Sequence, residues 1–170
     1  MGLGNIHGIL QNQPVSASAP CRLDFGGTLD ISSFHYPMRT LAPCTVNLSL
    51  DLRTTVQLTA NSDDRIRISS AGFDDAAFDA GQAPYDHPLG LMFAVTDYFG
   101  ATGVHIDIHS TSPPKSGLGG SSVAAVALIA AYSKVLEIKK RSPLSREQMV
   151  LLAHAIEQGV AGALCGFQDH

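Results

Sequence analysis

The sequence predicts an α+β domain of two layers, in which helices pack on one face of a mostly antiparallel sheet. Two observations support this prediction. Apolar and polar residues alternate at 44–58, 65–69 and 104–108, which is the pattern of half-buried strands. Apolar residues recur at helical spacing at 87–99, 121–136 and 145–159. The chain has 170 residues, which is enough for one domain with a hydrophobic core.

The longest predicted strand runs from Cys44 to Leu58, and its alternation is typical of an antiparallel sheet with one solvated face. The turn-forming residues Asn61-Ser62-Asp63-Asp64 separate it from the strand at 65–69, so we expect these two strands to pair as a hairpin. Residues 71–86 are rich in Asp, Ala and Gly and predict a surface excursion. Residues 1–13 show no clear period, and we expect them to form a flexible N-terminus.

The last predicted helix begins at Ser145, which can form a capping box with Gln148. Glu157 falls inside the apolar stripe of this helix and close to its C-terminus, whereas His154 falls off the stripe and is expected to be exposed. A buried carboxylate without a partner is costly, and the helix dipole disfavours it at this end. We therefore expect a positive group to face Glu157. The alternative is a frayed helix end that leaves Glu157 in solvent.

A glycine-rich stretch joins the strand at 104–108 to the helix at 121–136. It reads Pro113-Pro114-Lys115-Ser116-Gly117-Leu118-Gly119-Gly120-Ser121-Ser122. Glycines allow close approach of the backbone to a phosphate, and the free amides of a helix N-terminus attract anions. Ser121 and Ser122 can cap the helix or bind a metal carried by the phosphate. On local chemistry alone, a glycine-rich turn with serine caps is an equally good interpretation.

Composition excludes several classes of protein. The formal net charge is −4 and tryptophan is absent, so neither a nucleic-acid surface nor a stacking platform is expected. Three scattered cysteines indicate free thiols in a reducing compartment. The most apolar run, Val123 to Tyr132, is about half of the ~20 residues that a membrane span needs, and no signal peptide is visible. We expect a cytoplasmic protein without a membrane segment.

Three motifs occur in order along the chain. Pro113 to Ser121 reads Pro-x-x-x-Gly-Leu-Gly-(Ser/Gly)-Ser, and Ser18 to Asp30 reads Ala-Pro-x-Arg followed by a glycine-rich turn with an acid. Near the end, Glu157 is followed by Cys165-Gly166-x-x-Asp169. Together these motifs resemble the GHMP kinases, a family named for galactokinase, homoserine kinase, mevalonate kinase and phosphomevalonate kinase. The motif from Ser18 to Asp30 most resembles the sugar-kinase branch of the family, especially the heptose 7-phosphate kinases. The motif from Glu157 to Asp169 resembles that of the galactokinases.

The resemblance implies a two-layer fold like that of ribosomal protein S5 domain 2. It also implies transfer of the ATP γ-phosphoryl group, with Mg²⁺, to a hydroxyl of a sugar or sugar phosphate. Residues 14–170 would form the N-terminal ATP-binding domain, and the C-terminal domain of the family would be missing. We therefore expect this chain alone to be inactive as a kinase, and its exposed apolar surface to favour a homodimer.

The resemblance also implies roles for individual residues. Asp169 would orient or deprotonate the acceptor hydroxyl, with help from Arg22, while Ser121 and Glu157 would hold magnesium. The phosphates would be cradled by Pro114, Lys115, Ser116, Gly117, Leu118, Gly119, Gly120, Ser121 and Ser122. The substrate would contact Asp24, Gly27, Thr28 and Asp30.

Several alternatives stay open. The chain could be a non-catalytic relative that binds or regulates, although such a protein need not keep Ser121, Glu157 and Asp169 together. It could be a kinase of a non-sugar alcohol such as mevalonate or homoserine, although the turn from Phe25 to Asp30 favours a sugar. From the residues alone, Arg22 could be an ordinary surface arginine and Asp169 a loop-capping carboxylate. No role is predicted for His170.

Overall fold

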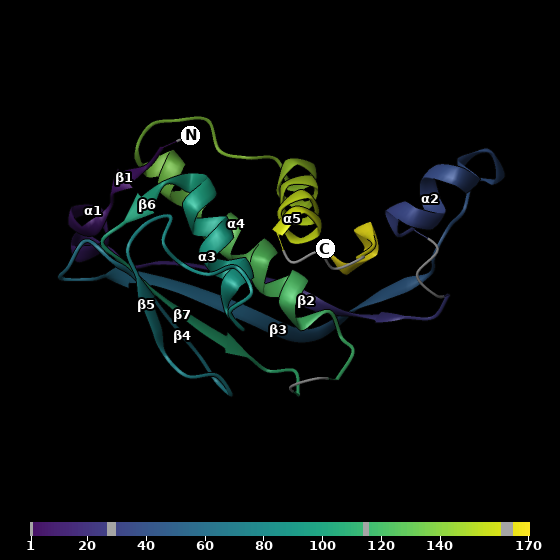
Figure 1. Cartoon of the computed structure of the whole chain (residues 1–170), viewed down its shortest axis with the longest axis horizontal. Helices are drawn as coiled ribbons and strands as arrows, with labels where there is room; N and C mark the ends of the chain where they lie inside the picture. The colour runs from purple at the N-terminus through teal and green to yellow at the C-terminus, as the bar shows by residue number, and fades with distance from the viewer. Residues whose placement is uncertain (1, 27–29, 114–115, 161–164) are drawn as a thin grey trace.

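The computed structural model describes residues 2–26, 30–113, 116–160 and 165–170, and places a layer of helices over one sheet (Figure 1). The strands of the sheet lie in the order β2, β3, β7, β4, β5, with bounds Val15–Asp24, Asn47–Ala60, Val104–Ser110, Ile66–Ser70 and Ala76–Phe78. Neighbouring strands are antiparallel except for β7 and β4, which run parallel. The predicted two-layer α+β class with a mostly antiparallel sheet is therefore confirmed.

The predicted hairpin between the strands at 44–58 and 65–69 is wrong, because β7 lies between them. Ile106 of β7 is in register with Leu58 of β3 on one side and with Ile68 of β4 on the other. The turn itself forms, and the Asn61 side chain donates to the Arg65 carbonyl at 3.1 Å. Turn residues specify a reversal of the chain, but they do not specify that the two strands pair directly. The apolar inner face of β7 is buried best at the centre of the sheet.

Helices α3 (Gly90–Phe99) and α4 (Gly120–Ile138) pack on the inner face of the sheet, and α5 (Arg146–Val160) packs against both of these helices. The predicted capping box of α5 forms, since Ser145 Oγ accepts from Gln148 N at 3.2 Å and Gln148 Oε1 accepts from Ser145 N at 2.8 Å. By length and composition alone, α4 could cross a membrane. Its apolar residues, such as Leu128 and Ile129, are instead fully buried against the sheet and the other helices, as in the core helix of a globular domain.

The flexible terminus expected at residues 1–13 requires correction, because residues 2–13 pack against the domain. The short strand β1 (Gly4–Asn5) pairs in parallel with β6 (Ala101–Thr102), and α1 (His7–Asn12) contacts β3. Leu3, Ile6 and Leu10 are buried in the core. Leu3 and Ile6 flank β1 and Leu10 lies in α1, so the buried residues come from two short elements and show no single period in the sequence.

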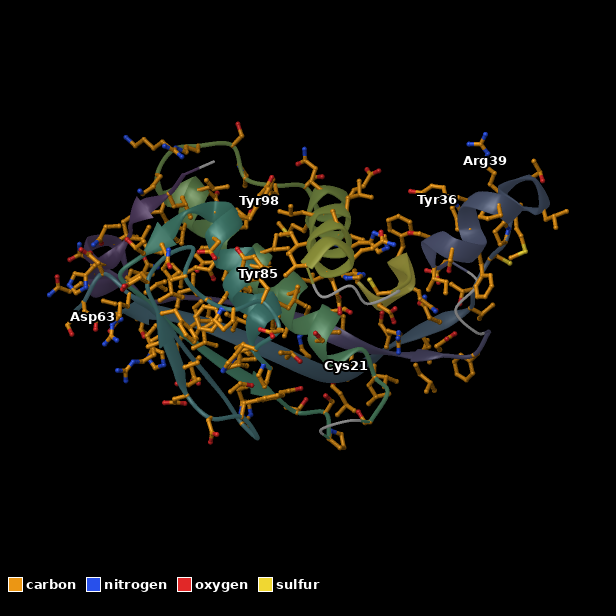
Figure 2. All side chains as sticks on the ribbon, in the orientation of Figure 1. Cys21, Tyr36, Arg39, Asp63, Tyr85 and Tyr98 are labelled. Carbon is orange, nitrogen blue, oxygen red and sulfur yellow. The ribbon has the colours of Figure 1, made fainter. Side chains whose placement is uncertain are left out.

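One end of the molecule projects beyond the core, and we call it the arm. It comprises the C-terminal end of β2, α2 (Ser32–Met38), η1 (Arg39–Leu41) and the N-terminal end of β3. Tyr36 and Arg39 mark it in Figure 2. Within the predicted alternation at 44–58, Val56 and Leu58 are buried, but Leu48 on the arm is exposed. The exposed apolar side chains of the arm are Leu23, Phe25, Phe34, Tyr36, Leu41, Val46 and Leu48.

Candidate active site

The glycine-rich loop enters α4 through residues that adopt left-handed backbone conformations. Gly117 and Gly119 have φ of 73° and 75°, which glycine tolerates without the steric cost of a side chain. Gly119 is the N-cap residue of α4, and no side chain caps this end of the helix. Ser121 and Ser122 therefore do not serve as the caps that the sequence allowed. The predicted loop residues Pro114 and Lys115 lie outside the described residues.

The first turn of α4 is open to a ligand. The intrahelical bonds begin with Val123 N, which donates to Gly119 O at 2.9 Å. Gly120 and Ser121 are exposed, and a Cβ atom built at Gly120 meets nothing within 4 Å. Amides at an uncapped helix N-terminus form a suitable site for a phosphate. Of the remaining loop residues, Ser116 is exposed and Leu118 packs partly against the core.

Arg22, on β2, joins the glycine-rich loop to the end of the chain. Its Nη1 donates to the Gly117 carbonyl at 2.8 Å, and its Nη2 forms an ion pair with Asp169 in η2 (Phe167–Asp169). The side chains of Arg22 and Asp169 are only 14% and 13% exposed, so Arg22 is not an ordinary surface arginine. The second Asp169 oxygen accepts from Gly166 N at 2.9 Å. Asp169 therefore both caps its own turn and faces the loop.

Asp24 lies near the arm end of the same region and is held as a charged acceptor. Its Oδ1 accepts from Gly26 N at 2.9 Å, and its Oδ2 accepts from the Gln168 side chain at 3.3 Å. The hydrogen bond from Gly26 N is the largest cause of the lowered pKa of Asp24, followed by an opposing effect of burial. The hydrogen bonds from Gln168 and Thr45 and the charge of Arg22 lower this pKa further.

Asp30 is buried beside the segment that carries Asp169. Its Oδ2 accepts from Gln168 N at 2.7 Å, and its Oδ1 has no hydrogen-bond partner within the described part of the chain. A Cβ at Gly166 would lie 2.2 Å from Asp30 Oδ1, so glycine is required there for this close approach. The structure thus brings Asp24 and Asp30 together through Gln168. The other predicted substrate residues, Gly27 and Thr28, lie outside the described residues.

Glu157 is buried, as its place in the apolar stripe predicts. Its Oε2 accepts from Ser122 Oγ at 2.7 Å and lies 2.9 Å from His170 Nε2. The group that faces this carboxylate is therefore the imidazole of His170, for which the sequence suggested no role. The predicted metal ligand Ser121 is exposed, whereas its neighbour Ser122 is the serine in contact with Glu157.

The expectation that His154 is exposed is wrong. His154 is 5% exposed, its Nε2 lies 3.2 Å from the Cys165 carbonyl, and its ring stacks on Phe167 at 4.0 Å between centroids. The last residues of the chain fold back over this side of α5 and bury it. Helical periodicity cannot reveal this, because the covering segment comes later in the sequence. The contacts of Gln168 and His170 were also missed, because their partners lie in other elements of the chain. Both residues flank the predicted Asp169.

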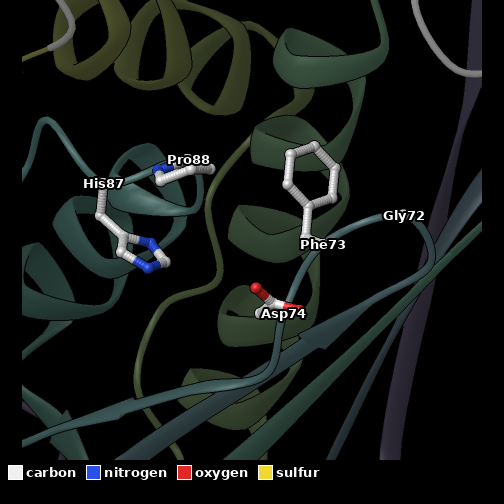
Figure 3. Close-up of a pocket in the computed structure, with 5 residues that line it drawn as sticks. All are labelled: Gly72, Phe73, Asp74, His87 and Pro88. Carbon is white, nitrogen blue, oxygen red and sulfur yellow. The ribbon is translucent and has the colours of Figure 1, made fainter.

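A pocket of about 320 Å³ lies between the sheet, α4, α5 and η2, next to the Arg22–Asp169 pair. Its lining residues are Ala19, Pro20, Arg22, Asn47, Ser49, Val123, Val126, Val150, Phe167, Gln168, Asp169 and His170. A larger hollow, of about 490 Å³, is lined by Gly72, Phe73, Asp74, His87 and Pro88 (Figure 3). It contains none of the predicted site residues. We therefore assign the chemistry to the smaller pocket.

Comparison with known proteins relates the chain to one family. The family model described as GHMP kinases N terminal domain matches residues 87–170. The mevalonate kinase of Pyrococcus abyssi is 38% identical over 80 residues, which cover 47% of this chain and 22% of that protein. The mevalonate kinase of Saccharolobus solfataricus is 41% identical over 75 residues, which cover 44% of this chain and 23% of that protein.

Solved structures share the fold over nearly the whole chain. A D-glycero-D-manno-heptose 1-phosphate kinase from Bacteriodes thetaiotaomicron aligns with a TM-score of 0.75 and 24% identity, covering 91% of this chain and 51% of that chain. A galactokinase from Lactococcus lactis, in complex with galactose, aligns with a TM-score of 0.70 and 17% identity, covering 94% and 41%. The chain thus spans about half the length of these structures, and it has the predicted fold of ribosomal protein S5 domain 2.

Proposed function

We propose that this chain is the nucleotide-binding part of a kinase, because residues 87–170 match the model of the GHMP kinase N-terminal domain family. The reaction is transfer of the ATP γ-phosphoryl group, with Mg²⁺, to a hydroxyl of a sugar or sugar phosphate. One observation carries this proposal: Arg22 contacts both the glycine-rich loop, at the Gly117 carbonyl, and the carboxylate of Asp169. A group that binds phosphate and a group that accepts a proton therefore lie on the two sides of one guanidinium.

On the donor side, the amides of the first turn of α4 bind the phosphates of ATP. This end of the helix is uncapped and its dipole favours negative charge. Gly120 leaves the approach open, since no atom of the described residues outside its own helical turn lies within 4 Å of where its Cβ would be. The charge of Arg22 stabilises the transferring phosphoryl group, because phosphoryl transfer depends mainly on positioning and electrostatic stabilisation.

On the acceptor side, Asp169 accepts a hydrogen bond from the substrate hydroxyl and then its proton. Its ion pair with Arg22 and its hydrogen bond from Gly166 hold the carboxylate in a fixed orientation. The pocket of about 320 Å³ beside this pair is the place where the two substrates meet.

The oxygen donors at Glu157 fit magnesium, which prefers carboxylate, hydroxyl and phosphate oxygens. Glu157 and Ser122 lie together within the fold, and Ser121 is exposed on the first turn of the same helix. Glu157 together with one of these serines would hold the ion. When bound, magnesium neutralises charge on the phosphates.

A sugar is the favoured acceptor because several polar groups converge near Asp169. Asp24, Asp30 and Gln168 form one hydrogen-bonded cluster, and Asp30 Oδ1 has no partner among the described residues. Such a cluster suits a substrate with several hydroxyl groups. A non-sugar alcohol is the second candidate, because curated relatives of this segment carry the name mevalonate kinase. We propose a cytoplasmic location and a C-terminal domain that completes the enzyme.

The reaction is tested by ADP release from the full-length protein with heptose phosphates, galactose, mevalonate and homoserine. We expect turnover with a sugar or sugar phosphate. Turnover with mevalonate or homoserine alone would establish the second candidate. Nucleotide binding without any turnover would indicate the non-catalytic alternative.

The nucleotide site is tested by calorimetric titration with a non-hydrolysable ATP analogue, with and without magnesium. We expect binding that depends on magnesium and is weakened by Glu157→Ala. Comparison of Ser121→Ala with Ser122→Ala identifies the serine that contributes. Ser62→Ala, an exposed serine outside the site, is the matched control. Equal binding by all variants would contradict the assignment of the site.

A further inference from the structure

Three different metal-binding side chains converge where α5 meets the end of the chain. The ligand atoms of Glu157, Cys165 and His170 all lie within 4.8 Å of one another. Glu157 and Cys165 are buried at 7% exposure each, and the His170 side chain is fully buried. The thiol of Cys165 and the imidazole of His170 have no role in phosphoryl transfer as proposed above.

Outer hydrogen bonds hold two of these groups in the orientation that ligands adopt. His170 Nδ1 lies 3.2 Å from the Gly166 carbonyl, which directs Nε2 towards the cluster. Glu157 Oε2 accepts from Ser122 Oγ at 2.7 Å. Metal-binding histidines commonly donate their second ring nitrogen to a carbonyl, and metal-binding carboxylates are themselves hydrogen-bonded.

Both ring nitrogens of His170 face oxygen acceptors, since Nε2 lies 2.9 Å from Glu157 Oε2. A metal ion between Nε2 and the carboxylate would satisfy both atoms at once. The Cys165 sulphur then supplies the third ligand, and a water molecule can complete a tetrahedral set.

We propose that Glu157, Cys165 and His170 bind a transition-metal ion of the zinc class. The chemistry of the donors distinguishes this site from a magnesium site, because magnesium takes oxygen ligands and avoids thiolates and imidazoles. Zinc combines sulphur, nitrogen and carboxylate ligands in one tetrahedral site.

A small rearrangement of the cluster is required. Zinc bonds of about 2.0–2.3 Å place two ligands of one ion roughly 3.5 Å apart. His170 Nε2 and Glu157 Oε2 must therefore move slightly apart from 2.9 Å. The Cys165 sulphur, which lies within 4.8 Å of both atoms, must lie about 3.5 Å from each. Cys165 and His170 lie on either side of the short helix η2, so a small shift of this one segment can make the adjustment.

Binding must release protons. Cysteine binds zinc as a thiolate, so the Cys165 thiol must lose its proton when the metal binds. The S–H bond breaks, the sulphur–metal bond forms, and the proton passes to the buffer. No change of oxidation state is involved.

One consequence rests on the proposed function. Glu157 is shared between this site and the proposed magnesium site, so an ion held by Cys165 and His170 removes Glu157 from magnesium. Zinc would then inhibit the kinase in competition with magnesium, whereas zinc binding itself does not depend on the kinase reaction.

The direct test is titration of the 170-residue chain with Zn²⁺ and with Co²⁺ in the absence of nucleotide. Cys44 is exposed and could bind metal on its own, so the titration uses a Cys44→Ser background. We expect one ion per chain, a binding enthalpy that varies with the ionisation enthalpy of the buffer because protons are released, and a thiolate-to-cobalt charge-transfer band. Absence of stoichiometric binding, or binding without this band, would overturn the proposal.

Variants assign the ligands. Cys165→Ser, Cys165→Ala and His170→Gln should each weaken zinc binding at least about tenfold, and the two cysteine variants should abolish the charge-transfer band. The controls are Cys21→Ala, a buried thiol on β2 (Figure 2), and His109→Gln, an exposed imidazole on β7. Circular dichroism identifies variants that fail to fold. Equal affinity in the ligand and control variants would contradict the site, whatever the outcome of the kinase assays.

Discussion

The glycine-rich loop lies beside two carboxylates, Glu157 and Asp169, but the polar groups of these two regions differ in their exposure and in their partners. The first turn of α4 leaves its amides uncapped, and Gly120 and Ser121 are exposed. The carboxylates of Glu157 and Asp169 are instead buried or nearly so, and are held by Ser122, His170 and Arg22.

This difference separates two kinds of functional group. Backbone amides at a helix terminus can remain hydrated until a ligand arrives, so the loop needs no internal partner. A buried carboxylate cannot, because desolvation without a partner costs several kcal/mol. We therefore expect substitutions of Glu157 and Asp169 to affect stability as well as catalysis. Changes in the loop should mainly affect nucleotide binding.

The largest effect is expected for Asp169→Asn in the full-length protein. Asparagine keeps the size of the side chain but cannot accept the proton of the hydroxyl, so kcat should fall by about 10²–10⁴-fold. Steady-state kinetics measures this fall, and Asp74→Asn, an exposed site at the other hollow, is the control. A decrease of less than about tenfold would argue against proton transfer to Asp169.

Glu157→Ala should destabilise the 170-residue chain in the absence of any ligand. The substitution leaves Ser122 Oγ and His170 Nε2 without their shared acceptor, which should lower the free energy of unfolding by about 2–4 kcal/mol. Urea denaturation measures the change. Glu137→Ala, on the exposed face of α4, should stay within about 0.5 kcal/mol. Equal effects of the two substitutions would contradict the expectation that the buried carboxylates contribute to stability.

Two adjacent glycines separate stability from binding in the loop. Gly119→Ala forces a side chain into a φ of 75°, which should cost about 1–2 kcal/mol of folding free energy. The methyl group of Gly120→Ala meets no atom of the described residues within 4 Å outside its own helical turn, so folding should be unchanged or slightly improved. The same methyl group should nevertheless weaken binding of an ATP analogue in calorimetry. Unchanged affinity would mean that phosphate does not approach this residue.

The last predicted effect is a loss of stability at alkaline pH. The pKa of Cys165 rises from 9.0 to about 11 on folding, so between these values the unfolded chain binds fewer protons than the folded one. Stability should therefore fall as pH rises from about 9 to 11, as measured by the urea midpoint. Cys165→Ser should make this decline shallower, whereas Cys44→Ser, at an exposed cysteine, should not. An identical slope in both variants would show that other groups cause the decline.

Sequence patterns alone predict the periods of the main strands and helices and the position of the glycine-rich loop. They also place Glu157 within an apolar stripe. These features follow from local rules, because a strand or helix shows its buried face through its own spacing. The capping box of Ser145 and Gln148 is equally local, and it forms as predicted.

Tertiary packing sets which groups meet. It placed β7 between β3 and β4, Ser122 rather than Ser121 against Glu157, and His170 against the same carboxylate. It also buried His154 under Phe167. Each of these contacts joins two different elements of the chain. A local pattern predicts which face of an element is buried, but not which element it packs against. Packing made those choices, since buried polar and apolar surfaces must each find a partner elsewhere in the chain.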